Sequence, residues 1–479
     1  MKKIIILLIC LVGAAEVNAQ NISGSWVGSL TVGGTNLHLV FNIKKATDTS
    51  FISTFDSPDQ KVFGLKCEST FLKKDSLFIK CGALNGGYTG TWDEKDGING
   101  IFRQGPGKIS ISLKRISEAE NNALATDPVR PQTPKPPFPY YSEDVEYNNA
   151  GKSLHYGATF TRPNGEGKYP AVIIISGSGT QDRDGTMMKG HKPYWVLADY
   201  LTRNGIAVLR VDDRGAGKSS LGDSINSKTS LDFSYDVETS LNYLETRTDV
   251  DKKHLGLIGH SEGGMIAPMV AARRKDVNFI VLWGGPAAGG ASVLARQYAN
   301  SLVQQGVDTA SANSYEKVYF QILQLVGSSP DEKIFETKAV STFNAWKNMQ
   351  PQQTLDALNI PGDMTTKIAK LYNDVNNAPW TRFFVSYDPE KDLSKVKCAV
   401  LAIIGEKDMQ VHAAENLAAA KRILTAAGNK DVEVKALPGL NHLLQTANTG
   451  QVDEYAAIQE TMSPMAMKII SDWIKLHTK

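Results

Sequence analysis

Residues Leu255-Gly256-Leu257-Ile258-Gly259-His260-Ser261-Glu262-Gly263-Gly264 carry most of the information about the fold of this chain. The apolar run 255–258 is typical of a strand buried on both faces of a parallel sheet. It leads into Gly259 to Gly263, which fits the pattern G-x-S-x-G, and a helical stretch over 264–274 follows. A strand, a tight turn and a helix in this order hold a serine hydroxyl at the carboxyl edge of a sheet. The segment predicts Ser261 as a nucleophile; the alternative is an ordinary glycine-rich turn.

Further apolar runs alternate with helical patterns along the same part of the chain. The runs are 169–175, 206–211, 278–283, 399–404 and 432–437. This alternation predicts the α/β class, with an open, mostly parallel sheet flanked by helices. Residues 287–392 contain no buried-strand run, only patchy helical patterns. An insertion between two sheet strands predicts a helical cap over the strand ends, and the alternative is a structural excrescence.

A serine hydroxyl is a weak nucleophile and needs a base that a carboxylate orients. When the serine lies in a strand-to-helix turn of this kind, called the elbow, the acid follows it in the chain and the histidine follows the acid. Asp408 follows the strand over 399–404 and is the predicted acid, with Glu406 as the weaker option because it lies closer to the strand end. His442 follows the last strand and is the predicted base, with His412 as its competitor.

The oxyanion formed in such chemistry needs two hydrogen-bond donors. One predicted donor is the backbone N–H of Glu262, the residue after the nucleophile. The other should come from the glycine-rich loop over 176–185, whose glycines allow the backbone to approach a ligand. We predict the N–H of Ser178, with Gly177 or Gly179 as alternatives.

Other classes of site receive no support from the sequence. The segment 212–219 contains Gly-Lys-Ser, but a Walker A loop would need glycine where Asp212 stands. There is no H-E-x-x-H, no C-x-x-C and no complete calcium loop, so we expect neither a metal nor a cofactor. Lys plus Arg is 52 and Asp plus Glu is 50, a net charge of +2, which gives no reason to expect a nucleic-acid partner. The oligomeric state is left open.

The first residues resemble an export signal. Lys2 and Lys3 precede the unbroken apolar run 4–12, and small or short residues follow at 17–19. This pattern predicts a signal peptide over 1–19 and a periplasmic or extracellular protein. The alternative is a membrane anchor, but the apolar run is too short to span a bilayer and no later stretch reaches the required length. We expect no integral membrane segment after cleavage.

Residues 22–116 read as a small all-β domain, because short alternating runs are separated by Gly-rich turn signals. A proline-rich linker is predicted over 117–139. The motif Gly24-Ser25-Trp26, echoed at 90–92, resembles the start of lipocalin-like small barrels; a tryptophan that plugs any β core is the alternative. The domain is either a binding module or an element of stability.

Three cysteines follow the predicted signal peptide: Cys67, Cys81 and Cys398. An exported protein meets an oxidising environment, which permits a disulfide. Cys67 and Cys81 lie on alternating segments that could be neighbouring strands, so they could form a disulfide or remain free thiols. Cys398 opens an apolar run and is expected to be a buried thiol.

Five motifs occur in the second part of the chain: Gly-Ser-Gly-Thr-Gln-Asp-Arg-Asp at 177–184, D-x-R-G-x-G-x-S at 212–219, Gly-His-Ser-Glu-Gly-Gly at 259–264, Gly-Glu-Lys-Asp-Met-Gln-Val at 405–411 and Pro-Gly-Leu-Asn-His at 438–442. With these motifs, residues 140–479 resemble the bacterial α/β-hydrolases, and closer still a carboxylesterase-like branch of them. The resemblance implies the α/β-hydrolase fold with a triad at Ser261, Asp408 and His442.

The same resemblance implies hydrolysis of a small-molecule ester with a short acyl group, through an acyl-enzyme on Ser261. Fold does not fix function, so two rivals stay open. One is a serine peptidase or acylaminoacyl hydrolase on the same fold. The other is a binding protein whose hydrolase domain is catalytically idle. The natural substrate, its acyl length and its alcohol are not specified by the sequence.

Overall fold

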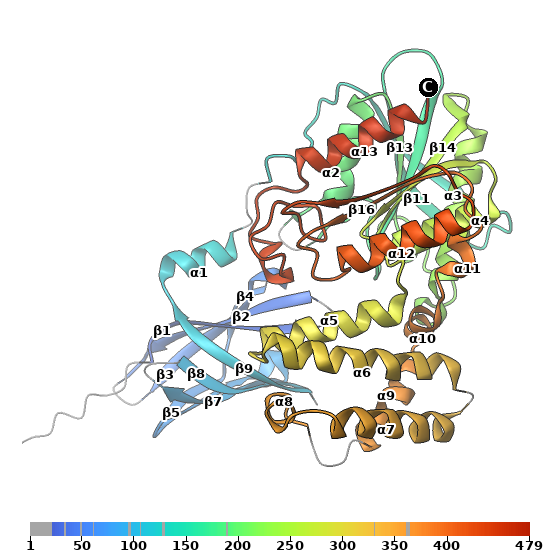
Figure 1. Cartoon of the computed structure of the whole chain (residues 1–479). Helices are drawn as coiled ribbons and strands as arrows, with labels where there is room; N and C mark the ends of the chain where they lie inside the picture. The colour runs from blue at the N-terminus through green and yellow to red at the C-terminus, as the bar shows by residue number, and fades with distance from the viewer. Residues whose placement is uncertain are drawn as a thin grey trace, which may run out of the picture. The chain divides into compact units, whose positions relative to one another are not determined.

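The chain divides into two units, Met1–Asp127 and Pro128–Lys479 (Figure 1). The predicted signal peptide lies outside the residues that the structure, a computed structural model, describes. The described residues are 22–32, 35–47, 50–60, 62–93, 97–105, 107–126, 130–187, 190–329, 331–360 and 365–479.

The first unit is a closed antiparallel β-barrel. Its strands follow the order β2-β1-β9-β8-β7-β6-β5-β3-β4, and an additional pairing between β2 and β3 closes the sheet. Closure satisfies the backbone groups that an open sheet would leave at its edges. The strands are β1 (Gly24–Val32), β2 (Thr35–Lys45), β3 (Phe51–Ser57), β4 (Val62–Lys66), β5 (Ser69–Lys73), β6 (Ser76–Cys81), β7 (Gly86–Asp93), β8 (Gly97–Gln104) and β9 (Gly107–Ile116).

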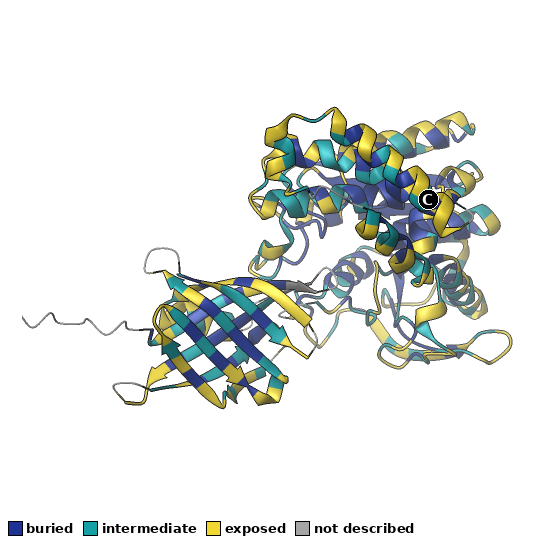
Figure 2. Cartoon of the chain, turned by 90° about the horizontal axis from the view of Figure 1, so that it is seen from below, coloured by how far each residue is buried: buried dark blue, intermediate teal, exposed yellow. Residues whose placement is uncertain are grey.

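The barrel has a core of its own, and buried and exposed positions alternate along several of its strands (Figure 2). Trp26 is buried, and its Nε1–H donates to the carbonyl of Ile22 over 2.9 Å. The guanidinium of Arg115 lies 4.7 Å from the centre of the Trp26 ring. Phe41, Phe55 and other large side chains fill the core beside Trp26. Trp26 is thus part of the barrel core.

Helix α1 (Glu118–Ala125) lies in the first part of the range predicted as linker, so the linker prediction was wrong for these residues. No proline occurs between 117 and 127. Ser117 and Glu120 form a capping box: the Glu120 carboxylate accepts the N–H of Ser117 over 2.7 Å. A capping box of this kind stabilises a helix start even in a short segment. The prolines that follow form no helix in the described residues from 130 to 139.

The second unit is built on an eight-stranded sheet of order β10-β11-β13-β12-β14-β15-β16-β17. From β13 to β17 the strands run parallel, as predicted. The antiparallel pair β10 and β11 at one edge was not predicted, because β10 is largely polar and exposed. The strands are β10 (Tyr141–Asn148), β11 (His155–Arg162), β12 (Tyr169–Ile175), β13 (Ala207–Val211), β14 (Val250–His260), β15 (Val277–Trp283), β16 (Ala399–Gly405) and β17 (Val432–Leu437).

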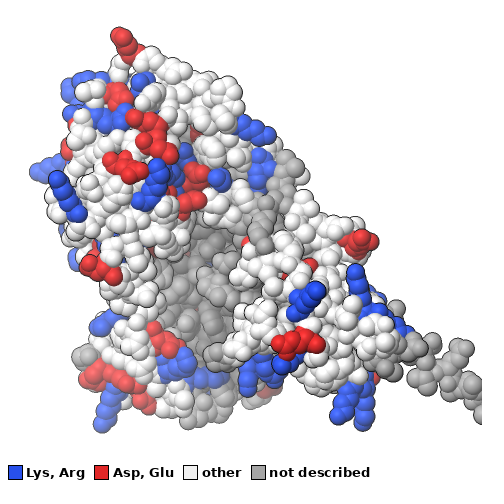
Figure 3. Space-filling model, turned by 180° about the vertical axis from the view of Figure 1, so that it is seen from behind, with Lys and Arg blue, Asp and Glu red and all other residues white. Residues whose placement is uncertain are grey.

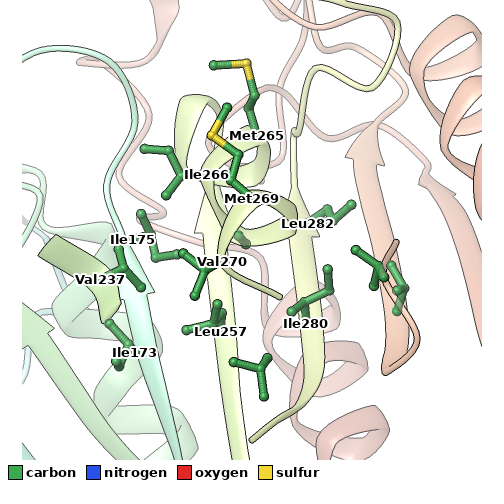
Figure 4. Packing of buried hydrophobic residues seen from close by; sticks show 14 of the residues in the cluster. Ile173, Ile175, Val237, Leu257, Met265, Ile266, Met269, Val270, Ile280 and Leu282 are labelled. Carbon is green, nitrogen blue, oxygen red and sulfur yellow. The ribbon is translucent and has the colours of Figure 1, made fainter. Parts of the chain in front are cut away.

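Helices cover both faces of this sheet. Helices α2 (Pro193–Arg203) and α13 (Pro464–Leu476) share a core with one face. Helices α3 (Ser230–Thr246), α4 (Glu262–Arg273) and α12 (Ala413–Ala426) share a core with the other. Figure 4 shows Met265, Ile266, Met269 and Val270 of α4 beside Ile173, Ile175, Leu257, Ile280 and Leu282 of the strands. This packing holds the start of α4, and with it the elbow, against the sheet.

The insertion between β15 and β16 is helical and has its own apolar core, which includes Phe335, Phe343 and Trp346. We call it the cap. Its helix α5 reaches the loop after β16, where the Asn300 side chain donates to the carbonyl of Met409 over 2.6 Å. The cap helices are α5 (Gly290–Gln304), α6 (Thr309–Ser328), α7 (Glu332–Asn348), α8 (Gln352–Ala357), α9 (Thr365–Asn376), α10 (Pro379–Ser386) and α11 (Glu390–Leu393).

Acidic and basic side chains are interspersed on the face shown in Figure 3. Among the described residues, no helix has both the length and the apolar character needed to cross a membrane.

Candidate active site

Ser261 lies between the last residue of β14 and the first residue of α4. Its backbone has φ 54° and ψ −117°, a conformation that L-residues rarely adopt. Such backbone strain costs about 1–3 kcal/mol and persists only where the surroundings enforce it. Here the Ser261 N–H donates to the carbonyl of Trp283 over 2.8 Å, and its own carbonyl accepts the N–H of Gly264 over 2.8 Å. The turn is therefore the strained strand-to-helix elbow that the motif predicts.

Gly259 and Gly263 of the elbow have no room for a side chain. A Cβ at Gly259 would lie 2.0 Å from the carbonyl oxygen of Gly263. A Cβ at Gly263 would lie 2.4 Å from the carbonyl oxygen of Ile175. Both distances are far inside van der Waals contact, so neither position accepts a larger residue without moving the backbone.

The predicted acid and base form a buried pair. His442 Nδ1 lies 2.7 Å from Asp408 Oδ2, and the two side chains are 3% and 1% exposed. The other oxygen, Asp408 Oδ1, accepts the N–H groups of Gln410 and Val411, each over 2.8 Å. Because a carboxylate only accepts, the proton of His442 sits on Nδ1 and the lone pair is on Nε2. The arrangement gives His442 the tautomer that a general base needs.

The competing acid and base occupy different environments. Glu406 and His412 are both solvent-exposed. His412 precedes α12, and its carbonyl accepts the N–H of Asn416 over 3.2 Å. His412 therefore has the position of a residue at a helix start.

His260 lies beside His442 and packs against the residues that hold the site. Its ring centre is 4.9 Å from that of His442 and 4.2 Å from that of Trp283. Its Nδ1 is 2.9 Å from the hydroxyl of Tyr194. Burial holds the pKa of His260 well below its usual range, so the ring is neutral. The Trp283 Nε1–H also donates to the carbonyl of His442 over 3.0 Å, which fixes the loop that carries the base.

The loop predicted to hold an oxyanion donor lies directly against the serine. A Cβ at Gly177 would be 3.2 Å from the Cβ of Ser261. The N–H of Gly177 already donates to the hydroxyl of Tyr194 over 3.1 Å, so this alternative donor is occupied. Ser178 and Gly179 are exposed, and the N–H of Ser178 remains our prediction.

The half-buried carboxyl of Asp213 fixes the shape of this loop. Asp213 accepts the hydroxyl of Ser176 over 2.6 Å and the N–H of Gln181 over 2.9 Å. Burial first, and then the nearby carboxyls of Glu262 and Asp236, raise the pKa of Asp213 to about 7.

Comparison with known proteins finds partial similarity to hydrolases. A model of the family described as serine aminopeptidase, S33, matches residues 190–320. The esterase EstD of Thermotoga maritima is 30% identical over 122 residues, which cover 26% of this chain and 28% of the esterase. These partial matches agree with the sheet, the elbow and the cap described above. The second unit has the α/β-hydrolase fold.

Similar solved structures include two hydrolases. The esterase Pf2001 of Pyrococcus furiosus is 15% identical, with a TM-score of 0.40, over 73% of this chain and 98% of that one. The α/β hydrolase GrgF of a Penicillium species is 17% identical, with a TM-score of 0.41, over 70% of this chain and 99% of that one.

The segment 212–219 has a structural role in this fold. The Asp212 carboxylate accepts the backbone N–H groups of Arg183 and Lys218, over 2.8 and 2.9 Å. A Cβ at Gly217 would lie 2.2 Å from Asp212 Oδ2, which explains the glycine. The Gly-Lys-Ser sequence therefore belongs to a turn that wraps around a carboxylate.

Sequence reasoning missed two contributors to the site. Tyr194 contacts both Gly177 and His260, yet it lies on α2 with no motif around it. The buried side chain of Glu262 was also missed, because the motif concerns only its backbone N–H. Among the described residues, no group of three or more His, Cys, Asp or Glu side chains could hold a metal ion.

Proposed function

We propose that this α/β-hydrolase is a serine carboxylesterase that cleaves short-acyl esters through an acyl-enzyme on Ser261. The observation that carries the proposal is the buried 2.7 Å contact between His442 Nδ1 and Asp408 Oδ2. It supports a histidine whose Nε2 can accept a proton. The strained serine and the adjacent Gly177 loop supply the other parts that acyl transfer requires.

In the proposed mechanism the Ser261 hydroxyl attacks the ester carbonyl while His442 Nε2 takes its proton. The N–H groups of Ser178 and Glu262 hold the oxyanion, and Asp408 stabilises the imidazolium. The tetrahedral intermediate collapses, His442 returns the proton to the alcohol, and the alcohol leaves. A water molecule, deprotonated by His442, then attacks the acyl carbonyl. The bond to the Ser261 oxygen breaks, His442 returns the proton to that oxygen, and the carboxylic acid is released.

A second candidate is a serine peptidase or acylaminoacyl hydrolase. The description of the matching family model, serine aminopeptidase, favours it. The same residues would act in the same order, with an amine as the leaving group.

The test is a comparison of two substrate panels. One contains p-nitrophenyl esters of increasing acyl length, and the other contains aminoacyl p-nitroanilides. We expect the purified protein to prefer short esters and Ser261→Ala to lose turnover on every substrate while it stays folded. Turnover of the amides alone would establish the peptidase. An absence of turnover, together with no labelling of Ser261 by a fluorophosphonate, would leave a binding protein with an idle hydrolase domain.

We also propose that the protein is exported. The support is the charged start and apolar run of residues 1–19. Intact-mass measurement of protein secreted or released from the periplasm should give a chain that begins at Gln20. A full-length chain retained in the cytosolic fraction would contradict the proposal.

A further inference from the structure

We infer that the Glu262 side chain is a positioning residue that couples the cap to the oxyanion-binding loop of the active site. The inference rests on the proposed function and adds to it: it assigns a role to a side chain where the motif assigns only a backbone N–H.

Glu262 is the first residue of α4 and is only 3% exposed. Its Oε1 accepts the hydroxyl of Ser230 over 2.7 Å and the indole N–H of Trp380 over 2.7 Å. The hydroxyl of Ser178 also hydrogen-bonds to the carboxyl. One buried carboxyl thus receives donors from the start of α3, from cap helix α10 and from the loop beside the serine.

These contacts converge on the predicted oxyanion site. The backbone N–H of Glu262 is one predicted donor, and the residue that its side chain holds, Ser178, supplies the other. A shift of about 1 Å in such groups can cost about a hundredfold in rate. The side chain therefore connects, through a single group, the two donors whose separation must match the oxyanion.

The contact with Trp380 extends this connection to the cap. Trp380 stacks on Phe384 at a centroid distance of 5.0 Å, and α10 packs against α5 and α6 of the cap and against α3 below it. A buried carboxyl is costly to leave unpaired, and burial raises the pKa of Glu262. Loss of the Trp380 N–H would therefore change the energy of the cap position and of the loop together.

The experiment is a double-mutant cycle on kcat and KM, with a small phosphonate that labels Ser261 as a second readout. Glu262→Met keeps the length of the side chain and removes its acceptors. We expect kcat and the labelling rate to fall by about tenfold or more, since a misplaced oxyanion donor acts on the transition state. Trp380→Phe keeps the ring and should mainly raise KM by a few fold, because the bonds to Ser230 and Ser178 remain.

The coupling between these variants is the decisive measurement. In the Glu262→Met background, Trp380→Phe should have no further effect, because its partner is gone. Trp346→Phe is the matched control: Trp346 lies in the cap core, and its indole N–H donates to the carbonyl of Ser314 over 3.1 Å. Its effects should be small and additive with Glu262→Met. Additive effects of Trp380→Phe would overturn the inference.

Two further variants keep the test decisive if Glu262→Met does not fold. Glu262→Gln retains an oxygen for Ser230 and Trp380 and offers an amide to the Ser178 hydroxyl, so it should retain much more labelling than the Met variant. Ser178→Ala and Trp380→Phe remove groups that share only Glu262, and the inference requires these two substitutions to be non-additive. If the wild-type protein is labelled at Ser261 but hydrolyses no ester, the proposed function is refuted. The double-mutant cycle can then still be measured from the labelling rates, so the two failures are distinguishable.

Discussion

Gly284 lies against the imidazole of His442: a Cβ at Gly284 would be 3.1 Å from both Nδ1 and Cε1 of that ring, and 3.6 Å from Asp408 Oδ2. The backbone of Gly284 also has φ +61°. The residue after β15 must therefore be small so that the acid and base can meet beside it.

Gly284→Ala should lower kcat/KM by about tenfold to a hundredfold, because the methyl group displaces the His442 ring from its proton-transfer position. Gly289→Ala is the control. Gly289 also has a positive φ, +96°, but its nearest neighbour, Pro389, is at ordinary contact distance, 3.6 Å. Both substitutions should cost about 1 kcal/mol of stability through the backbone. Steady-state kinetics on folded protein should separate them, and equal losses of turnover would contradict the role given to Gly284.

The second prediction separates the proposed triad from its competitors. Asp408→Asn and His442→Ala should each reduce ester turnover by about three orders of magnitude or more, since groups that act as a unit are lost together. Glu406→Gln and His412→Ala change exposed residues and should stay within a few fold of wild type. Active-site titration with a phosphonate would correct for folded fraction. A His412 variant as impaired as the His442 variant would refute the assignment.

The third prediction concerns Asp213. Its pKa is raised by burial from an ordinary 3.8 to about 7, so the folded protein holds a proton that the unfolded chain releases at lower pH. The stability that this group contributes is present below about pH 4 and is lost as the pH rises through about 7.

Asp213→Asn can keep both hydrogen bonds, since its oxygen accepts the Gln181 N–H and its amide donates to Ser176. Relative to wild type, the variant should therefore gain stability as the pH rises from about 4 to 8, by up to about 4 kcal/mol. Urea denaturation at several pH values measures this difference. The exposed Asp223→Asn is the control. A difference that does not vary with pH would show that Asp213 is not protonated in the folded state.

The fourth prediction concerns the barrel cysteines. The Sγ atoms of Cys67 and Cys81, both thiols in this structure, lie 2.8 Å apart. We expect oxidised glutathione to convert them to a disulfide, with the loss of two hydrogens and a gain of about 3 kcal/mol in barrel stability. Burial raises the pKa of both Cys81 and Cys398 to about 12, so the half-buried Cys67 should attack the oxidant first and Cys398 should stay reduced. Peptide mass spectrometry without reduction would show the cross-link, and two persistent thiols after oxidation would exclude it.

The fifth prediction concerns where the hydrolase unit begins. The Gln132 side chain donates to the carbonyl of Met462 over 2.7 Å and accepts its N–H over 3.1 Å. A fragment over 130–479 should fold alone, because the unit has its own core. A fragment over 137–479 loses these bonds, the Thr461 N–H bond to Gln132 and the two bonds of the Arg130 guanidinium to the carbonyls of Ala456 and Ile458. It should be less stable by about 5 kcal/mol, at about 1 kcal/mol for each lost hydrogen bond. Denaturation of the two fragments, with Gln132→Ala in the longer one as the control, would test this.

The parallel part of the sheet was predictable because its strands are buried on both faces. Runs such as 169–175 and 399–404 are almost wholly apolar, and they coincide with β12 and β16. The edge strand β10 was missed because one side of it meets solvent, so its sequence lacks that signal. Helix α1 was not predicted because the linker prediction extended the proline-rich segment to residues 117–127, which contain no proline.

The sequence by itself determined the α/β-hydrolase fold and the order of Ser261, Asp408 and His442 along the chain, because strand burial and the tight elbow are local properties of consecutive residues. Only the tertiary structure brought Asp408 to His442, Tyr194 to His260, and Glu262 to Trp380, pairs that are 34, 66 and 118 residues apart. Such contacts depend on how several elements pack together, and no local pattern records them. The distance from the strand end already favoured Asp408 over Glu406, and the folded loop adds that Asp408 is buried with two backbone donors whereas Glu406 is exposed.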